Sequence, residues 1–574
     1  MLHARARCYS KFYTTSRAPI VHIPKANVFR FGDPNTAAPI FRSLQWTVHE
    51  GDAWAVIGSG SGEKAMLFRT LLGHLRISPA PPPPGGLFPF LSTSSTEDIR
   101  TSTSTSDPYS HIALVSFSHR PRTSGGGFYD FTARYGAVRD LDRLTLRQSM
   151  FPETVPPEFP ELELPRDENA KEMSELEKQV FGALVDRMGL RELLDLPLVA
   201  LSNGQTRRAR IVKAILRKPE LLLLDEPLTG LDVQSRPRLL EVLRALHTAR
   251  APRVVLGLRT QDPVPEWVTH VAFVNNGRVV AGPKEEVLPA VEHIVATAST
   301  KEAPVVRASE RGELLVDMKG INVKYGTRTV LKDINWQIRQ GERWHLQGTN
   351  GSGKTTLLAL LTGAHPQSYT QPHLHLHGRP RPRLPTPYLQ SLVALFSPEL
   401  FDAFPRRTGM RVWDAVATGF DGGFVPLGRG KEAVGVGVMR PLSEEEVAWR
   451  MWRCWAVLEA LGPGAWGGDA DGTGVDTKAF AERAFVDLPV GEQRMVLLMR
   501  ALVGRAPLVL LDEVWSGMGE GMVRAARQYL RSGEGVGPEQ AVVVITHWEE
   551  EVPWTVTEGV RRFRLDGGFG MVVD

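Results

Sequence analysis

A glycine-rich loop at residues 348–355, GTNGSGKT, constrains the fold of this chain more than any other segment. It follows a strand-like WHLQ and precedes an apolar helical pattern, TLLALLTG, which is the context of a phosphate-binding loop (P-loop). Glycines let backbone N–H groups approach phosphates, a lysine reaches the β- and γ-phosphates, and a hydroxyl ligates Mg²⁺. The predicted ATP-binding residues are Gly348, Asn350, Gly351, Ser352, Gly353, Lys354, Thr355 and Thr356, with Thr355 also a metal ligand.

Two carboxylates end an apolar, strand-like segment further along the chain, LVLLDE. We expect Asp512 to hold Mg²⁺ through water and Glu513 to polarise the water that attacks the γ-phosphate. His547 follows the strand-like VVVIT and completes a catalytic set that could sense that phosphate. A carboxylate pair after a strand is usually a solvated strand end, and a single histidine is usually structural. Their order behind the glycine-rich loop favours hydrolysis.

The first half repeats this order with an altered loop, GSGSGEKA, at residues 58–65. Glu63 stands at the place of Gly353, and Ala65 stands at the place of Thr355 and offers no oxygen to magnesium. A carboxylate about 5 Å from a phosphate charge costs roughly 3 kcal/mol at an effective dielectric near 20, unless the side chain swings into solvent. We therefore expect a weaker nucleotide site, built from Gly58, Gly60, Ser61, Gly62 and Lys64.

The strand LLLLDEP of the first half supplies the matching carboxylates, Asp225 for the metal and Glu226 for catalysis. Arg259 aligns with His547 when the Val-Pro pairs at 264–265 and 552–553 are matched. A guanidinium cannot accept a proton, so Arg259 cannot replace a histidine in that role.

A short motif between loop and strand identifies the family that this chain resembles. Leu201-Ser202-Asn203-Gly204-Gln205, followed by TRRARIVKAIL, resembles the signature LSGGQ of ABC proteins. The counterpart LPVGEQ at 488–493 keeps Gly491 and lacks the serine, and Leu231-Asp232 fits the family's D-loop, whereas Met518-Gly519 does not. The chain resembles tandem ABC ATPases without membrane spans, especially the molybdenum-transport/photorepair-like group with its LSNGQTRR-type signatures.

The resemblance implies an α/β fold of two P-loop NTPase domains, each with a parallel-sheet core, an antiparallel β part and a helical subdomain. We expect these domains at 20–290 and 313–574, joined by a linker at 291–312. A low-complexity stretch of Pro, Ser and Thr at about 78–110 is expected to be an insertion in the first domain.

In the ABC family two domains pair head to tail, so that each ATP lies between one P-loop and the other signature. Site two would then join Lys354, Thr355, Asp512, Glu513 and His547 with Ser202, Asn203, Gly204, Gln205 and Asp232. Site one would join Lys64, Asp225 and Glu226 with Gly491. The altered residues all fall at site one, which we expect to be degenerate.

Aromatic residues before each loop resemble the family's adenine-stacking positions: Tyr325 and, with a core role equally open, Phe31. The glutamine that the family usually carries between P-loop and signature is not evident near Ser118 or Ser397. This departure puts a standard coupling to a membrane domain in doubt.

The resemblance implies an ATPase with the cofactors ATP and Mg²⁺ that drives conformational change in an unidentified protein partner, such as a transporter's membrane domain on another chain. A ribosome-associated ABC translation factor is a second hypothesis, although such factors usually have a long charged linker and two intact signatures. A nucleotide-dependent scaffold is a third, which Glu513 and His547 disfavour.

Composition and charge indicate whether this chain enters a membrane, binds nucleic acid or forms disulfides. No apolar run approaches the roughly 20 residues that cross a bilayer, so no membrane insertion is expected. Six basic residues and no acidic one lie within residues 1–32, which leaves the remainder near neutral, and we expect no direct nucleic-acid binding. Cys8 and Cys454 form no disulfide framework or metal-ligand pattern.

Residues 1–19, MLHARARCYSKFYTTSRAP, are rich in Arg, Ser and Thr and lack acids, as is typical of a mitochondrial transit peptide. Arg7-Cys8-Tyr9-Ser10 also resembles a matrix-peptidase cleavage site. The expected location is the mitochondrial matrix, and the alternative is a cytoplasmic protein with a disordered basic tail.

Overall fold

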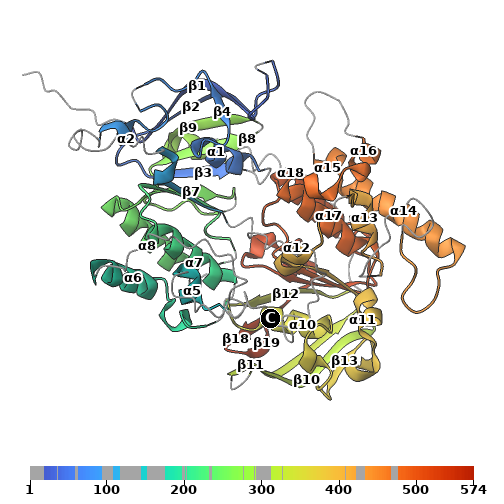
Figure 1. The fold of residues 1–574 in the computed structure, drawn as a ribbon. Helices are drawn as coiled ribbons and strands as arrows, with labels where there is room; N and C mark the ends of the chain where they lie inside the picture. The colour runs from blue at the N-terminus through green and yellow to red at the C-terminus, as the bar shows by residue number, and fades with distance from the viewer. Residues whose placement is uncertain are drawn as a thin grey trace, which may run out of the picture.

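Two halves of the same architecture make up the protein in a computed structural model (Figure 1). The structure describes residues 19–573, apart from 35, 59–61, 84, 94–107, 117–143, 152–174, 197–200, 202, 230, 232–234, 261, 276, 290, 292–311, 326–327, 408, 422–433 and 467–475.

The first half centres on a six-stranded sheet with the order β5-β6-β7-β3-β8-β9. Its strands are β3 (Trp54–Gly58), β5 (Ile112–Ser116), β6 (Leu221–Asp225), β7 (Arg253–Leu258), β8 (His270–Asn275) and β9 (Arg278–Pro283). A smaller antiparallel sheet contains β1 (Val21–Phe29), β2 (Phe41–Val48) and β4 (Arg76–Ser78). The helices are α1 (Glu63–Leu71), α2 (Pro89–Thr93), α5 (Leu146–Met150), α6 (Glu175–Arg187), α7 (Asn203–Leu216) and α8 (Ser235–Ala249).

The second half repeats the central sheet in the order β15-β16-β17-β12-β18-β19. Its strands are β12 (Arg343–Gly348), β15 (Val393–Phe396), β16 (Leu508–Asp512), β17 (Ala541–Ile545), β18 (Val560–Asp566) and β19 (Phe569–Val573). The smaller sheet contains β10 (Leu314–Tyr325), β11 (Arg328–Arg339), β13 (Leu374–Leu376) and β14 (Arg379–Pro380). The helices are α10 (Lys354–Leu361), α11 (Thr386–Leu392), α12 (Pro398–Ala403), α13 (Val412–Ala417), α14 (Glu444–Leu461), α15 (Pro463–Trp466), α16 (Thr477–Glu482), α17 (Val490–Val503) and α18 (Glu520–Arg531).

The strands β6 and β16 occupy the same place in the two central sheets and are buried at every residue. They read LLLLD and LVLLD. Inner parallel strands are covered on both faces, so they need continuous apolar runs. The apolar run ends at the aspartate in each half, which places a carboxylate at the carboxyl edge of each sheet.

A matched pair of tryptophans joins the two sheets of each half. Trp46 of β2 lies edge-on to Trp54 of β3, with ring centroids 5.7 Å apart. Trp336 of β11 and Trp344 of β12 repeat this contact at 5.5 Å. All four rings are buried, so each pair fixes its antiparallel sheet against the sheet that carries the glycine-rich loop.

Part of the segment expected as an insertion belongs to the core of the first half. Leu87, Phe88 and Phe90 are buried and join the cluster beneath β1, and the backbone N–H of His22 donates to the Leu87 carbonyl. The apolar run GLFPFL supplies this packing in the middle of a polar stretch.

The two antiparallel sheets lie at opposite ends of the molecule, with β1 and β2 at the top left and β10 and β13 at the bottom right (Figure 1). The halves are therefore inverted relative to one another. Within the described residues, no helix combines the length and the apolar character needed to cross a membrane.

Candidate nucleotide-binding sites

The second-half loop has a backbone that only glycine can follow without strain. Gly351 and Gly353 have φ values of 83° and 105°. A Cβ on Gly353 would lie 2.6 Å from the Leu331 side chain. α10 begins at the next residue without a side-chain cap, so its first N–H groups face the place where phosphates bind. The Lys354 ammonium donates to the carbonyls of Gly348 and Thr349, at 2.7 and 3.0 Å.

Two carboxylates with opposite pKa shifts lie beside this loop. Burial and the negative charges of Glu399 and Glu513 raise the pKa of Asp512 well above its usual range, against the effect of Lys354. Burial alone would raise the pKa of Glu513 as well, but the cations Arg207, His547, Lys354 and Arg494 lower it. The Glu513 carboxylate is thus ionised at neutral pH, whereas Asp512 needs a cation to stabilise its anion.

The second-half histidine completes this group. His547 Nε2 lies 3.8 Å from Glu513 Oε1. Asp512 pairs with Ile545 in the sheet as Asp225 pairs with Gly257, so His547 and Arg259 occupy the same position two residues further along. The sheet register therefore agrees with the alignment made from the Val-Pro pairs.

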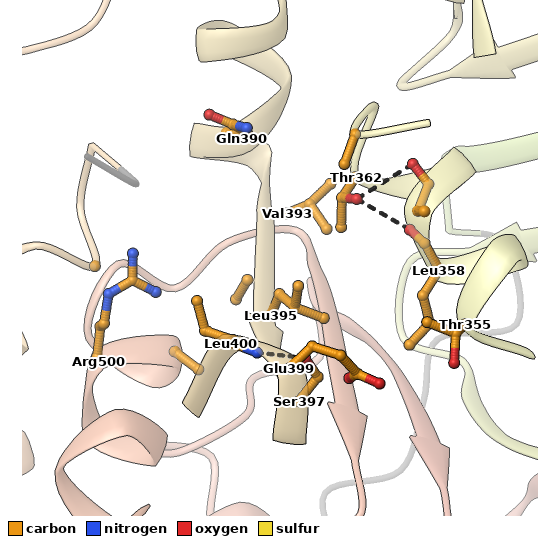
Figure 2. A pocket seen from close by; sticks show the side chains of 15 residues that line it. Thr355, Leu358, Thr362, Gln390, Val393, Leu395, Ser397, Glu399, Leu400 and Arg500 are labelled. Carbon is orange, nitrogen blue, oxygen red and sulfur yellow. Dashed lines mark hydrogen bonds between the residues drawn. The ribbon is translucent and has the colours of Figure 1, made fainter. Parts of the chain in front are cut away.

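A cavity of about 160 Å³ opens beside the Thr355 side chain (Figure 2). Its walls come from α10, β15, α12 and α17, and Glu399 of α12 lies at the same end as Thr355. Thr355 and Asp512 supply a hydroxyl and a carboxylate, the hard oxygen donors that Mg²⁺ prefers, and Glu399 lies close enough for its charge to raise the pKa of Asp512. The residues present fit a magnesium ion.

Glu399 was not identified as a residue of this site from the sequence. It lies in LFSPEL, the region searched for the family's glutamine, and follows Ser397, the N-cap of α12. Ser116 and Ser397 are equivalent, because Ser116 pairs with Asp225 and Phe396 pairs with the residue before Asp512. The register of a strand could have located this position, but only the structure brings Glu399 near Asp512.

The first half uses its loop lysine differently. The Lys64 ammonium is buried and lies 2.9 Å from Glu226 Oε1, 3.5 Å from Asp225 Oδ1 and 3.4 Å from the Leu258 carbonyl. Burial would lower the pKa of Lys64, but the two carboxylates raise it overall. Burial would raise the pKa of Glu226, yet Lys64 and Arg259 lower it to about 2. These groups form a compensated ion cluster inside the first half.

The altered loop residues accompany this cluster. α1 begins at Glu63, one residue earlier than α10 begins relative to its lysine, and Gly62 takes the left-handed conformation before it. The Glu63 carboxylate accepts from the Gly277 backbone N–H at 2.8 Å. The expected repulsion between Glu63 and phosphate is thus reduced, because this carboxylate is bound to the turn between β8 and β9.

Arg259 joins the two halves. Its guanidinium lies 2.9 Å from Asp262 and 3.2 Å from Glu551 of the second half. Arg236 lies over the Trp548 ring of the second half, 3.9 Å from the centroid. A small pocket between these contacts is lined from both halves, including by Glu513 and His547.

The signature of the first half lies against the loop of the second. A Cβ on Gly204 would be 2.6 Å from the Asn350 side-chain nitrogen. Arg207, in the next turn of α7, lowers the pKa of Glu513 across this contact. Site two therefore brings Lys354, Thr355, Asp512, Glu513 and His547 close to Gly204 and Arg207, and sequence reasoning had missed Arg207.

Gly491 and Phe31 are described by the structure, whereas several other predicted residues are not. Gly491 is buried in α17, and Arg494, three residues on, matches Arg207 and contributes a buried charge near Glu226 and Glu513. Phe31 is 66% exposed and not a core residue. Ser202, Asp232, Gly60, Ser61, Ser118, the 1–18 segment and the side chains of Asn203 and Tyr325 lie outside what the structure describes.

Comparisons with known proteins agree with this geometry. A family model described as ABC transporter matches residues 130–229 and 331–516. An uncharacterized ABC transporter ATP-binding protein of Schizosaccharomyces pombe is 29% identical over 92% of this chain and 95% of its own length. The ABC transporter ATP-binding protein ModF of Escherichia coli is 27% identical over 94% of this chain and 96% of its own.

Among solved structures, ribosome-bound archaeal Pelota and ABCE1 gives a TM-score of 0.51 at 16% identity, covering 96% of this chain and 78% of that one. A likeness at this identity concerns the fold alone. The chain belongs to the ABC family and has two ATP-binding domains in tandem. The evidence is the family model that matches both halves, the similarity to the two relatives, and the contact between the first signature and the second loop.

Proposed function

We propose that this protein is an ATPase that hydrolyses ATP at site two and uses site one as a structural element of the domain pair. The observation that carries this proposal is the opposite state of the two loop lysines. Lys64 is held in a buried cluster with Glu226 and Asp225, whereas Lys354 lies on its own loop carbonyls. Phosphate binding at site one would have to break that cluster.

At site two, Lys354 and the first N–H groups of α10 bind the β- and γ-phosphates. Thr355, and Asp512 through water, would hold Mg²⁺, which when bound would supply positive charge against these phosphates. Glu513 accepts the proton of the attacking water, and the positive charges of Arg207, His547, Lys354 and Arg494 lower the pKa of its carboxyl group. His547, 3.8 Å from Glu513, would sense the γ-phosphate. The products are ADP and phosphate.

One of the four cations that lower the pKa of Glu513, Arg207, comes from the other half, so we expect catalysis to respond to domain closure. ATP binding would draw Gly204 and Arg207 onto the second loop, and hydrolysis would release them. This is a switch of the order-and-release kind. We propose that the switch drives a conformational change in an unidentified protein partner. The relatives are named as ABC transporter ATP-binding proteins, which favours a membrane domain on another chain as that partner.

Steady-state Mg-ATPase activity of Glu513→Gln and Glu226→Gln tests the assignment. Removal of a general base typically lowers turnover about 10²–10⁴-fold, which we expect for Glu513→Gln. Glu226→Gln should retain turnover within about threefold, because its partner Lys64 is not in the working site. Equal losses in both variants would refute a single working site.

Co-sedimentation with ribosomes tests the alternative that the protein is a translation factor. ATP-dependent co-sedimentation of the full chain would support that alternative over a membrane partner.

The sequence of residues 1–19 is the basis of our proposal that the protein is located in the mitochondrial matrix. A fusion of these residues to a fluorescent protein should localise to mitochondria, and a diffuse cytoplasmic signal would refute it.

A further inference from the structure

The helix α14 carries apolar side chains on two faces. Cys454, Val457 and Leu458 are buried in the core that α13 and α17 complete. On another face, Trp449 and Trp452 are 41% and 61% exposed. A surface helix of a globular domain normally presents charged and polar residues there. Large exposed apolar side chains that gather on one face mark interaction sites.

These exposed residues form a continuous row, the tryptophan stripe. It contains Glu445, Trp449, Trp452, Ala456 and Glu459, which are spaced three or four residues apart on one side of the helix, and Ala448 next to Trp449. An acidic residue lies at each end and apolar residues lie between. At 1.5 Å per residue, the two acidic ends are about 21 Å apart, or about four helical turns.

Neighbouring contacts hold Trp449 of the stripe in place. The Trp449 ring packs on Phe420 with centroids 5.9 Å apart, and Arg450 lies over the same phenylalanine. Arg450 also pairs with Asp421 at 2.9 Å and donates to the Val434 carbonyl. An anchor that is rigid before binding loses little entropy when a partner docks, so these contacts favour recognition.

The charge around the stripe is acidic. Arg440 is paired with Glu446 at 2.8 Å, and Arg450 is paired with Asp421. Glu445 and Glu459 are exposed and have no ion pair within the described residues. A complementary partner therefore carries cations at both ends of its contact.

The matching helix of the first half lacks this feature. Both α6 and α14 pack on the helix that follows the signature, α7 or α17. The exposed face of α6 includes Lys178, Gln179 and Asp186, and Val180 is its one large exposed apolar side chain in the described residues. The stripe is thus a property of the second half and not a requirement of the fold.

We propose that the tryptophan stripe binds a helix of a partner protein, with an apolar face flanked by Lys or Arg about four turns apart. Trp449 and Trp452 are the anchors, because buried tryptophans dominate the binding energy of protein interfaces. Met451, 44% exposed at the edge of the stripe, adapts to the partner's shape. α14 projects at the right edge of the molecule, away from the first half, so a partner helix has access (Figure 1). The proposal does not depend on which site hydrolyses ATP.

Two synthetic amphipathic helical peptides test this surface on the full chain. Both have a Leu/Ala face, and one carries Lys in its first and last turns where the other carries Glu. Fluorescence anisotropy of the labelled peptides at roughly physiological salt should show binding of the Lys peptide alone. Trp452→Ser should weaken that binding at least about tenfold, and Val180→Ser on α6 is the matched control that leaves it unchanged.

A charge reversal, Glu445→Lys with Glu459→Lys, should weaken the Lys peptide and create binding of the Glu peptide. Equal binding of both peptides, or unchanged binding in Trp452→Ser, would overturn the proposal. So would a dimer in sedimentation equilibrium that Trp452→Ser dissolves, which would make a second copy the occupant. Binding to phosphatidylcholine vesicles without peptide binding would assign the stripe to a membrane surface instead.

Discussion

The two halves of this protein share a strand order, a glycine-rich loop and a carboxylate pair, yet their loop lysines lie in opposite environments. Lys64 is buried against Glu226 and Asp225, whereas Lys354 rests on loop carbonyls at the surface of its site. The difference supports our proposal that site one has a structural role. Once Ala65 removes a metal ligand, the lysine itself can neutralise the carboxylates that a metal would otherwise hold.

The largest expected contrast concerns closure of the domain pair. Lys354→Ala should abolish nucleotide-dependent compaction, because it removes the cation that binds the phosphates of site two. Lys64→Ala should reduce compaction much less. Small-angle scattering with and without Mg-ATP measures both. Equal effects of the two substitutions would break the asymmetry between the halves.

Stability should show the reverse order. Lys64→Ala leaves two buried carboxylates without their cation, and breaking a buried pair costs about 3–5 kcal/mol. Lys354→Ala removes a partly exposed lysine and should change stability by under about 1 kcal/mol. Thermal unfolding of the full chain, measured for each variant, reports the difference. The double variant Lys64→Met with Glu226→Gln should recover part of the loss, and no recovery would argue against an ion cluster.

Sequence reasoning predicted the fold, but the buried state of Lys64 in site one could not be predicted from it. Apolar runs that end in Asp-Glu and the glycine-rich loop are local patterns, so they could be found in one dimension. Arg207, Arg494, Glu399 and Glu551 act through contacts that depend on how the halves and subdomains pack. No local spacing indicates that a residue of α7 lowers the pKa of a glutamate in the other half.

Arg259 offers a test at the centre of the interface. Arg259→Ala removes the cation between Asp262 and Glu551, both of which are buried, and should loosen the contact by about 2–3 kcal/mol. Hydrogen exchange at amides 546–552 should accelerate by roughly tenfold or more. Arg236→Ala, which loses only its contact with Trp548, should cost about 0.5–1 kcal/mol. Equal rates of amide hydrogen exchange in Arg259→Ala and Arg236→Ala would mean that the interface does not depend on Arg259.

The smallest expected effect is a shift in the pH profile of turnover at site two. It depends on Glu399, which has no counterpart among the described residues of site one. Burial and the charges of Glu399 and Glu513 raise the pKa of Asp512, and magnesium binds the anion. Turnover should therefore fall, as pH decreases, at a higher pH than an ordinary aspartate would give.

Glu399→Gln removes one of the neighbouring charges, which lowers the pKa of Asp512 and should move this acidic limb to lower pH by up to about one unit. The plateau at alkaline pH should change less, because Asp512 is ionised there in both proteins. Profiles of kcat/KM against pH measure the shift, and Glu285→Gln, an exposed acid of the first half, is the control. A limb that moves to higher pH would mean that Glu399 itself helps to hold the metal, since losing a metal oxygen weakens binding most where protons compete. The direction of this one shift thus distinguishes a carboxylate that only perturbs Asp512 from one that shares its ion.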